Sequence, residues 1–360
     1  MVSKVKSEEN IPSLYDTFSL LEGVLDPVIV VAQERTIIYA NTAAEQALEN
    51  LKVNENLSIS LRHPEILQSV DAVLGGEDEK LGEITFTSPI PRTFEFQVKM
   101  INIFVEEQGL AMLAMRDITY LKSADQMRQD FVANVSHELR SPISSLVGII
   151  ETLQGSASKD PVSQKKFLKI MSEEAARMSR LIDDLLSLSR VEVTEHVPPD
   201  EKIKLPDIVG SAVEILRGIA NKKNMTIRFE EKSELFEILG DQDELMEVFQ
   251  NLIDNGIKYG DENSEIEILI EKVDRVPETD MPGVCISFKN KGDGIDEEHL
   301  PRLTERFYRA DKARSRNTGG TGLGLAIVKH IVSRHRGHLA IESFPGDTTT
   351  VSVFLPLYLK

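Results

Sequence analysis

The sequence is poor in cysteine and in aromatic residues. Its 360 residues include one cysteine, no tryptophan and only 6% aromatic residues. The single cysteine, Cys285, excludes an internal disulfide bond and a cysteine-based zinc cluster within one chain. No apolar run approaches the roughly 18–20 residues that a membrane-spanning helix requires.

Positive charge is also scarce. The sequence has 59 acidic and 41 basic residues, which gives a formal net charge of −18. An excess of negative charge on this scale argues against nucleic acid or an anionic membrane surface as the main partner. Residues 1–10 are polar and do not resemble a signal peptide. We therefore expect a cytoplasmic chain. An anchor upstream, which would hold it at the inner face of the membrane, stays an open alternative.

The composition otherwise predicts a globular protein of two or three domains. Hydrophobic residues make up 41% of the chain and charged residues 28%, which is too apolar for global disorder. Residues 13–118 contain short β-branched runs, which predict a small antiparallel sheet with helices on one side. The strands are expected at residues 28–32, 36–40, 82–86, 94–104 and 110–116, with a short helix capped by Asn41.

Residues 119–193 predict two long helices joined by a turn at residues 155–158. In the first helix, apolar residues recur every three or four positions and form one stripe. A helical hairpin has no enclosed core, so we expect the stripes of two copies to pack together in a dimeric four-helix bundle. The residues of the stripe in the first helix are Met127, Phe131, Val135, Leu139, Pro142, Leu146, Ile149 and Leu153.

Residues 194–206 form a predicted linker that contains three prolines, and residues 207–360 alternate helices and strands. Asp241 and Glu244 form a predicted capping box at the start of one helix. The alternation predicts an α/β sandwich. Its helices are expected at residues 207–221, 241–259 and 325–336, and its strands at 225–229, 265–273, 284–290, 339–343 and 349–355.

His137 is the candidate nucleophile of the helical hairpin. It lies about 160° around the helix from the apolar stripe, so its imidazole is expected to face solvent beside Glu138. Ser141 follows one turn later, and Pro142 removes the helical partner of the Glu138 carbonyl at a cost of about 3 kcal/mol. An exposed imidazole next to a carboxylate suits nucleophilic attack on a phosphoryl group. An ordinary surface histidine is the alternative.

Two kinds of feature in residues 207–360 suit a nucleotide. Asn251, Asn255 and Lys258 form a polar stripe on one helix, where amide oxygens can ligate Mg²⁺ and a lysine can contact phosphate. Glycine-rich turns at residues 290–295 and 319–325 let the backbone approach phosphates, and the second turn precedes a helix N-terminus. Basic residues between the turns favour a polyphosphate ligand: Arg302, Arg306, Arg309, Lys312, Arg314 and Arg316. A solvated charged surface is the alternative for both the stripe and the basic segment.

In this order, the motifs resemble those of a two-component sensor histidine kinase. SHELRSP at residues 136–142 is similar to the phosphoacceptor box, and NLIDNGIKY at 251–259 is similar to the N box. NKGDGI at 290–295 and GTGLGLAIVKHIV at 320–332 resemble the two glycine boxes, and RFYRAD at 306–311 resembles the phenylalanine box. Residues 13–118 resemble a PAS sensor domain. HRG at 335–337 and HPE at 63–65 are most similar to phosphate-regulon sensor kinases.

The resemblance implies a homodimer that binds ATP and Mg²⁺ and phosphorylates a response regulator. It implies that His137 accepts the γ-phosphoryl group, that Glu138 acts as base or orients the ring, and that Ser141 positions water for dephosphorylation of the regulator. Asn255 would ligate Mg²⁺ with Asn251 nearby. A mobile lid would include Phe307 and Arg309. The other implied nucleotide contacts are Lys258, Tyr259, Asn290, Gly292, Gly294, Gly320, Thr321, Gly322, Leu323 and Gly324.

Two positions depart from the family pattern. Asn290 stands where the family usually has an aspartate that accepts the adenine amino group, which predicts weaker ATP binding. Ser141 stands where Thr or Asn is commoner, which predicts a phosphatase activity that is retained but reduced. A pseudokinase scaffold and another ATPase of the same nucleotide-binding fold, such as a chaperone, remain alternatives. The signal is not identified, because no Asn-Cys-Arg-Phe flavin motif occurs and His63, followed by proline, is interpreted as structural rather than as a haem ligand.

Overall fold

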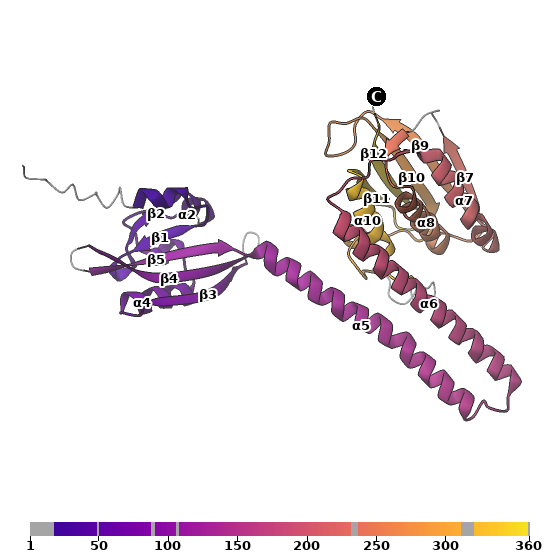
Figure 1. Ribbon diagram of the computed structural model, residues 1–360, viewed down its shortest axis with the longest axis horizontal. Coiled ribbons are helices and arrows are strands. Elements are labelled where there is room, and N and C mark those ends of the chain that lie inside the picture. The colour runs from indigo at the N-terminus through magenta and orange to yellow at the C-terminus, as the bar shows by residue number, and fades with distance from the viewer. Residues whose placement is uncertain are drawn as a thin grey trace, which may run out of the picture. The chain divides into compact units, whose positions relative to one another are not determined.

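The computed structural model describes residues 18–48, 50–87, 91–105, 108–231, 237–310 and 320–358. The chain divides into two compact units, Met1–Val132 and Ala133–Lys360. The division falls inside one long helix, and each unit is described by itself (Figure 1).

The first unit contains a five-stranded antiparallel sheet in the order β2-β1-β5-β4-β3. All five predicted strands are present. They are β1 (Val28–Val31), β2 (Ile37–Ala40), β3 (Glu79–Phe86), β4 (Arg92–Val105) and β5 (Gln108–Asp117). Short helices connect β2 to β3, namely α2 (Thr42–Ala47), α3 (Leu57–Ser60) and α4 (Pro64–Leu74), and two 3-10 turns, η1 (Ser19–Gly23) and η2 (Gln33–Arg35), flank β1.

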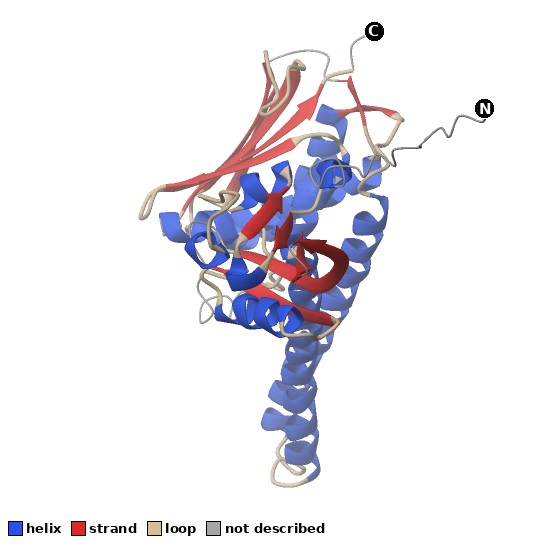
Figure 2. Ribbon diagram, turned by 90° about the vertical axis from the view of Figure 1, so that its left-hand side faces the viewer, coloured by secondary structure: helices blue, strands red, loops and turns tan. Residues whose placement is uncertain are grey.

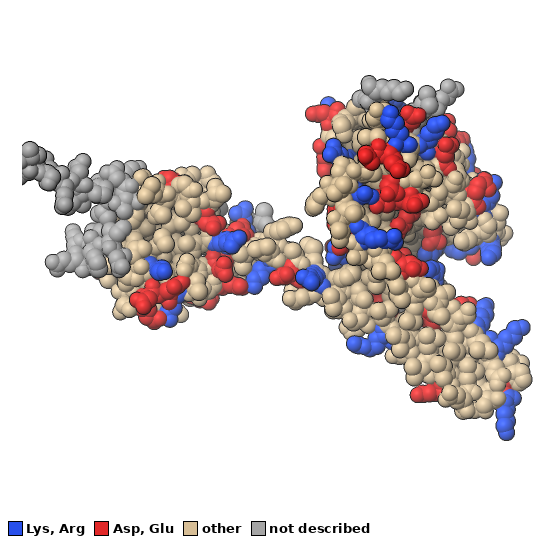
Figure 3. Space-filling view, in the orientation of Figure 1, with Lys and Arg blue, Asp and Glu red and all other residues tan. Residues whose placement is uncertain are grey.

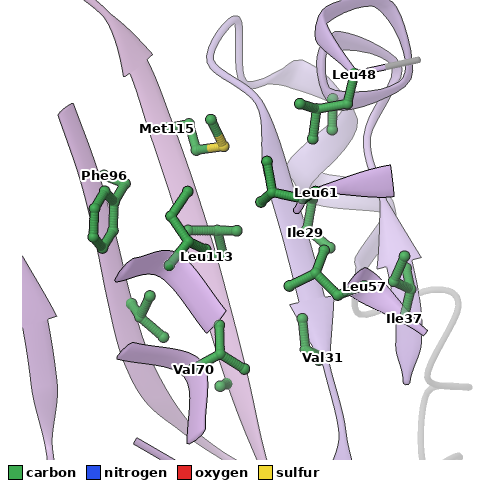
Figure 4. Packing of buried hydrophobic residues seen from close by; sticks show 14 of the residues in the cluster. Ile29, Val31, Ile37, Leu48, Leu57, Leu61, Val70, Phe96, Leu113 and Met115 are labelled. Atoms are coloured by element: carbon green, nitrogen blue, oxygen red, sulfur yellow. The ribbon is translucent and has the colours of Figure 1, made fainter. Parts of the chain in front are cut away.

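The core of the first unit lies between one face of the sheet and these helices. Alternate residues of the strands point into it, among them Ile29 and Val31 of β1 (Figure 4). Helix α4 contributes Ile66, Val70 and Val73, whose spacing places them on one side of the helix. Figure 4 shows Phe96, Leu113 and Met115 of the sheet facing Val70 and Leu61 of the helical layer.

The middle of the chain folds as an antiparallel helical hairpin, as predicted. Its helices are α5 (Thr119–Gln154) and α6 (Pro161–Thr194), which lie side by side in both ribbon views (Figure 2). Pro142 is inside α5 and is buried. The hairpin buries its predicted stripe only in part, and Met127 is 63% exposed. Further apolar side chains also face solvent: Ile143, Val147, Ile150, Leu168, Ile182 and Leu186.

The C-terminal part is an α/β sandwich, as predicted. Its five-stranded sheet has the order β11-β12-β10-β9-β7, in which only the β7–β9 pair is parallel. Helices α7, α8 and α10 pack on this sheet and on one another (Figure 1). The bounds are α7 (Leu205–Lys222), β7 (Thr226–Glu231), α8 (Gln242–Tyr259), β9 (Glu265–Val273), β10 (Gly283–Lys291), η3 (Glu297–Arg302), α10 (Gly324–Arg334), β11 (His338–Ser343) and β12 (Thr348–Pro356).

Two features of this part were not predicted correctly. The stretch interpreted as a linker contains a strand, β6 (Lys202–Lys204), which pairs with β8 (Glu237–Leu239). These strands are too short to give a periodic signal, and Ile203 of β6 is buried only because the tertiary fold covers it.

The capping box was correct in one half and wrong in the other. The Asp241 side chain accepts hydrogen bonds from the Asp243 and Glu244 amides, as expected of an N-cap. The Asp241 amide, however, donates to Nε2 of His335 over 3.0 Å, and the Glu244 carboxylate contacts Arg334 instead. Burial lowers the pKa of His335, so its neutral ring accepts this bond. The residue that follows α10 therefore completes the start of α8.

Asn41 is a fully buried polar residue in the first unit, and its side chain joins β1 to α2. Its Oδ1 accepts hydrogen bonds from the amides of Val28 and Ala44, both over 2.9 Å. Its Nδ2 donates to three carbonyl groups, those of Leu21, Val24 and Asp26. One buried amide thus hydrogen-bonds to five backbone groups, of which the Leu21 carbonyl and the Ala44 amide also have a backbone partner.

We predict that Asn41→Ala destabilises the first unit by about 2–4 kcal/mol, because buried backbone groups lose their partners. Native-state hydrogen exchange of the β1 and β5 amides measures this loss without unfolding the second unit. The control is Asn56→Ala, which removes the half-exposed N-cap of α3 and should cost about 1 kcal/mol. Equal effects of the two variants would contradict the role given to Asn41.

Candidate active site

The C-terminal unit contains a cavity of about 880 Å³ that opens between α8, the turn after β10 and the turn before α10. Most of the residues predicted to contact a nucleotide line it. Phe307 and Leu323 do not line it. Leu323 is fully buried in the core, and Phe307 instead donates its amide hydrogen to the Gly322 carbonyl over 2.8 Å. The predicted residues that line it are Asn251, Asn255, Lys258, Tyr259, Asn290, Gly292, Gly294, Arg309, Gly320, Thr321, Gly322 and Gly324.

Helix α8 forms one wall because its two faces differ. Phe249 and Ile253 are fully buried toward the sheet, where Phe249 stacks on Phe288. The opposite face places Asn251, Asn255 and Lys258 along the cavity, as their spacing predicted. Lys258 pairs with Asp254, one turn earlier, over 2.5 Å.

The glycine turns pass too close to neighbouring groups to carry side chains. Gly294 has φ +70°, and a Cβ atom there would lie 2.3 Å from the Phe344 carbonyl oxygen. At Gly322, φ is +76°, and a Cβ atom would lie 2.9 Å from Cα of Phe307. Bare backbone therefore lines the cavity beside the N-terminus of α10, an arrangement that favours an anion at this end.

His137 is exposed on α5, as predicted, and the carboxylate that follows it is linked to the cavity. Oε2 of Glu138 lies 3.2 Å from Nη2 of Arg177 on α6 and 3.6 Å from Nη2 of Arg309. Arg309 lines the cavity and also donates to the Gly320 carbonyl. Ser141 is exposed one turn after His137. Neither His137 nor Glu138 is among the described residues that line the cavity.

The sequence analysis missed the contribution of α6 to this cavity. Arg180 and Asp184 line it, and Oδ2 of Asp184 accepts a hydrogen bond from the Thr321 hydroxyl over 2.6 Å. Nearby, Ser187 donates to Glu247 of α8 over 2.7 Å. Burial raises the pKa of Asp184 and of Glu247. No local sequence signal could have indicated these contacts, because only tertiary packing brings α6 to the cavity.

The basic segment was interpreted as a source of cations for a polyphosphate, and this interpretation is wrong for two of its arginines. Arg302 pairs with Glu305 over 3.2 Å, and Arg306 pairs with Glu192 of α6 over 2.6 Å. Arg309 is the described member that lines the cavity. The remaining members, together with Asp311 of the motif at residues 306–311, lie outside the described residues: Lys312, Arg314 and Arg316.

The side chains that face the cavity fit a metal ion shared with a ligand better than a metal ion held by protein alone. The described residues contain no group of three or more His, Cys, Asp or Glu side chains that could hold a metal ion. Asn255 and Asn251 supply amide oxygens, and Oδ1 of Asn251 faces the glycine turn, 2.8 Å from where a Cβ atom of Gly324 would lie. Mg²⁺ commonly keeps waters and phosphate oxygens among its ligands, so this donor set suits it.

Comparison with known proteins agrees with this geometry. Residues 240–359 match the histidine kinase-, DNA gyrase B- and HSP90-like ATPase family, and residues 127–193 match the His Kinase A (phospho-acceptor) domain. The phosphate regulon sensor protein PhoR of Pseudomonas aeruginosa is 34% identical over 329 residues, which are 90% of this chain and 70% of that protein. The sensor-like histidine kinase SenX3 of Mycolicibacterium smegmatis is 34% identical over 253 residues, 70% of this chain and 64% of that protein.

Among solved structures, histidine kinase ThkA in complex with response regulator protein TrrA is similar with a TM-score of 0.49 and 21% identity, over 94% of this chain and 98% of that one. The sequence matches define a protein-histidine kinase with an ATP-binding domain. The chain belongs to the sensor histidine kinases of two-component systems. It spans only part of the length of the relatives described above. No helix in the described ranges is long and apolar enough to cross a membrane.

We predict that Asn290→Asp tightens ATP binding by about 1–2 kcal/mol, or roughly five- to thirtyfold in Kd. Asn290 lines the cavity, and its Nδ2 donates weakly to the Lys291 carbonyl over 3.3 Å. A carboxylate would offer the adenine amino group a stronger, charged acceptor. Equilibrium titration with ATP measures the change.

The control is Asn263→Asp, which adds the same charge at an exposed turn outside the cavity. It should leave Kd unchanged. Unchanged or weaker ATP binding by Asn290→Asp would show that Asn290 does not limit affinity.

Proposed function

We propose that this protein transfers the γ-phosphoryl group of ATP, bound in the cavity, to His137 and then to an aspartate of a response regulator. One observation carries the proposal. The carboxylate beside the exposed His137 contacts Arg309, and Arg309 lines the cavity. The guanidinium of Arg309 thus links the part of α5 that carries His137 to the wall of the proposed nucleotide site.

The chemistry required of the chain is modest. One ring nitrogen of His137 attacks the γ-phosphorus, the bond to the bridging oxygen breaks, and ADP leaves. Glu138 would hold the ring tautomer and receive the ring proton. Bound Mg²⁺, held by Asn255 and Asn251, would neutralise phosphate charge. Positioning of the reactants and neutralisation of charge supply most of the catalysis in phosphoryl transfer. A site made of the exposed His137 and the backbone of the glycine turns is consistent with this.

The phosphotransfer reaction is proposed to take place in a homodimer. The hairpin leaves Ile143, Val147 and Ile150 of α5 exposed, together with Leu168 and Ile182 of α6. Figure 3 shows few charged side chains on the face of the hairpin that it displays. Burying these apolar side chains against a second copy gives a four-helix bundle, and the exposed face around His137 then serves the receiver domain of the regulator.

The domain limits remain those proposed from the sequence. Residues 13–118 form a PAS-like sensor domain, supported by the five-stranded antiparallel sheet with helices between β2 and β3. Residues 119–193 form the dimerisation and phosphotransfer domain and 207–360 the catalytic domain, and the connection at 194–206 contributes β6, which pairs with β8 of the catalytic domain. The similarity to a phosphate regulon sensor supports a role in the response to phosphate starvation.

We predict that His137→Gln abolishes protein labelling by γ-labelled ATP. The wild-type label should be labile in acid and stable in base, as a phosphorus–nitrogen bond requires. ATP binding should be unaffected, because His137 does not line the cavity among the described residues. Binding without any label in the wild type would favour a pseudokinase, and ATP hydrolysis without label would favour another ATPase of this fold.

We predict that Ser141→Ala lengthens the half-life of the phosphorylated regulator several-fold in the presence of the kinase. The exposed hydroxyl lies one turn after His137 and can position a water molecule at the regulator aspartate. The matched control is Ser144→Ala, an exposed serine of the same helix. Equal half-lives with the wild type and Ser141→Ala would remove Ser141 from the phosphatase reaction.

A further inference from the structure

Helix α6 of the hairpin places a carboxylate at the nucleotide cavity. Asp184 lines the cavity and accepts the Thr321 hydroxyl over 2.6 Å. This contact belongs to a longer interface, called the seam below, between α6 and the catalytic domain (residues 207–360). In this interface α6 packs against α10. Further along the seam, Arg306 pairs with Glu192 and His330 pairs with Glu195 over 2.9 Å.

The charges around Asp184 do not fully compensate for its burial. Lys258 of α8 and Arg180 of α6 favour its ionised form, whereas Asp183 of α6 opposes it. Glu247 of α8 is a further acid that interacts with it. A carboxylate in this position adds negative potential to the wall of a cavity that must also accept phosphate groups.

Asp184 lies at the end of the cavity where phosphates are expected. Thr321 belongs to the glycine turn in front of α10, whose eleven residues begin at Gly324. The γ-phosphoryl group must also face the hairpin, because the hairpin carries His137. Asp184 is on the same hairpin and contacts the glycine turn, so we expect its carboxylate to face the phosphate that distinguishes ATP from ADP.

We propose that Asp184 is a specificity-determining residue that disfavours the triphosphate while α6 is seated on the glycine turn. ADP, which lacks the terminal phosphate, is compatible with the Asp184–Thr321 contact. ATP binds more weakly until α6 withdraws or the carboxylate charge is removed. The inference rests on the proposed function, since it requires nucleotide phosphates at this glycine turn.

The affinity for ATP and the docking of α6 on the glycine turn are coupled in both directions. If the seated helix weakens ATP binding, ATP must by linkage weaken the seating by the same factor. ATP would then free the catalytic part from α6, and ADP would allow it to return. Asp184 would in this way couple the bound nucleotide to the position of the catalytic part on the hairpin.

The test compares Kd for ADP and for a non-hydrolysable ATP analogue in the full chain. Asp184→Asn keeps an oxygen that can accept the Thr321 hydroxyl but removes the charge. We expect it to tighten binding of the analogue about five- to tenfold and of ADP less than twofold. Asp184→Ala should do the same, because the effect comes from the charge.

The matched control is Asp183→Asn, which removes the same charge from the neighbouring exposed position of α6, outside the cavity lining. Its ratio of the two Kd values should equal that of the wild type. An unchanged ratio in Asp184→Asn, or weaker analogue binding in Asp184→Ala alone, would overturn the proposal and leave Asp184 a structural residue. Failure of the wild type to bind either nucleotide would instead overturn the proposed function.

A second measurement uses the wild type alone and does not depend on the folding of a variant. Hydrogen–deuterium exchange in the C-terminal half of α6 should be faster with the ATP analogue than with ADP. Equal exchange with both nucleotides would contradict the coupling.

Discussion

The site depends on one constraint. One face of α8 must pack in the hydrophobic core while the opposite face lines the cavity. Its apolar face, with Phe249 and Ile253, is fixed against the sheet by complete burial. This burial fixes the rotation of α8 about its axis. The opposite face of the helix, with Asn251, Asn255 and Lys258, must therefore line the cavity. His335, which directly follows α10, completes the N-terminus of α8, so the two helices that flank the site are held in a fixed relation to each other. The polar side chains are positioned by hydrophobic packing rather than by their own bonds.

The contacts between the hairpin and the catalytic part are of a different kind. They include charged and hydroxyl groups on α6 that contact partners on the catalytic domain, such as Glu192 with Arg306 and Ser187 with Glu247, beside buried apolar residues of α6 such as Leu188. Partly exposed ion pairs contribute little each, typically up to about 1 kcal/mol. Each of these polar contacts can therefore be broken at a small cost in free energy.

Much of the fold followed from the sequence because its signals are local. Runs of β-branched residues predicted the strands of both sheets, and helical periodicity predicted the apolar faces of α5 and α8. The nucleotide wall followed from the spacing of Asn251, Asn255 and Lys258. What failed needed tertiary information. The strand at 202–204 exists only because 237–239 pairs with it, and the Asp241 amide found its partner in His335, far along the chain. Arg306 was taken for a phosphate ligand because nothing local indicates Glu192 as its partner.

The two unusual features of the cavity act in the same direction from different walls. Asn290 provides a neutral amide where a carboxylate is predicted to bind the base more tightly, and Asp184 provides a carboxylate near the glycine turn, where a neutral group is proposed to favour the triphosphate. Both are expected to weaken ATP binding, but only Asp184 would distinguish ATP from ADP, because the base is common to both nucleotides. Asn290 would lower the affinity for ATP and ADP alike. Discrimination between the two nucleotides would therefore depend on the part of the cavity that binds the phosphates. That part is the one in contact with α6, so the position of the hairpin can control which nucleotide is held.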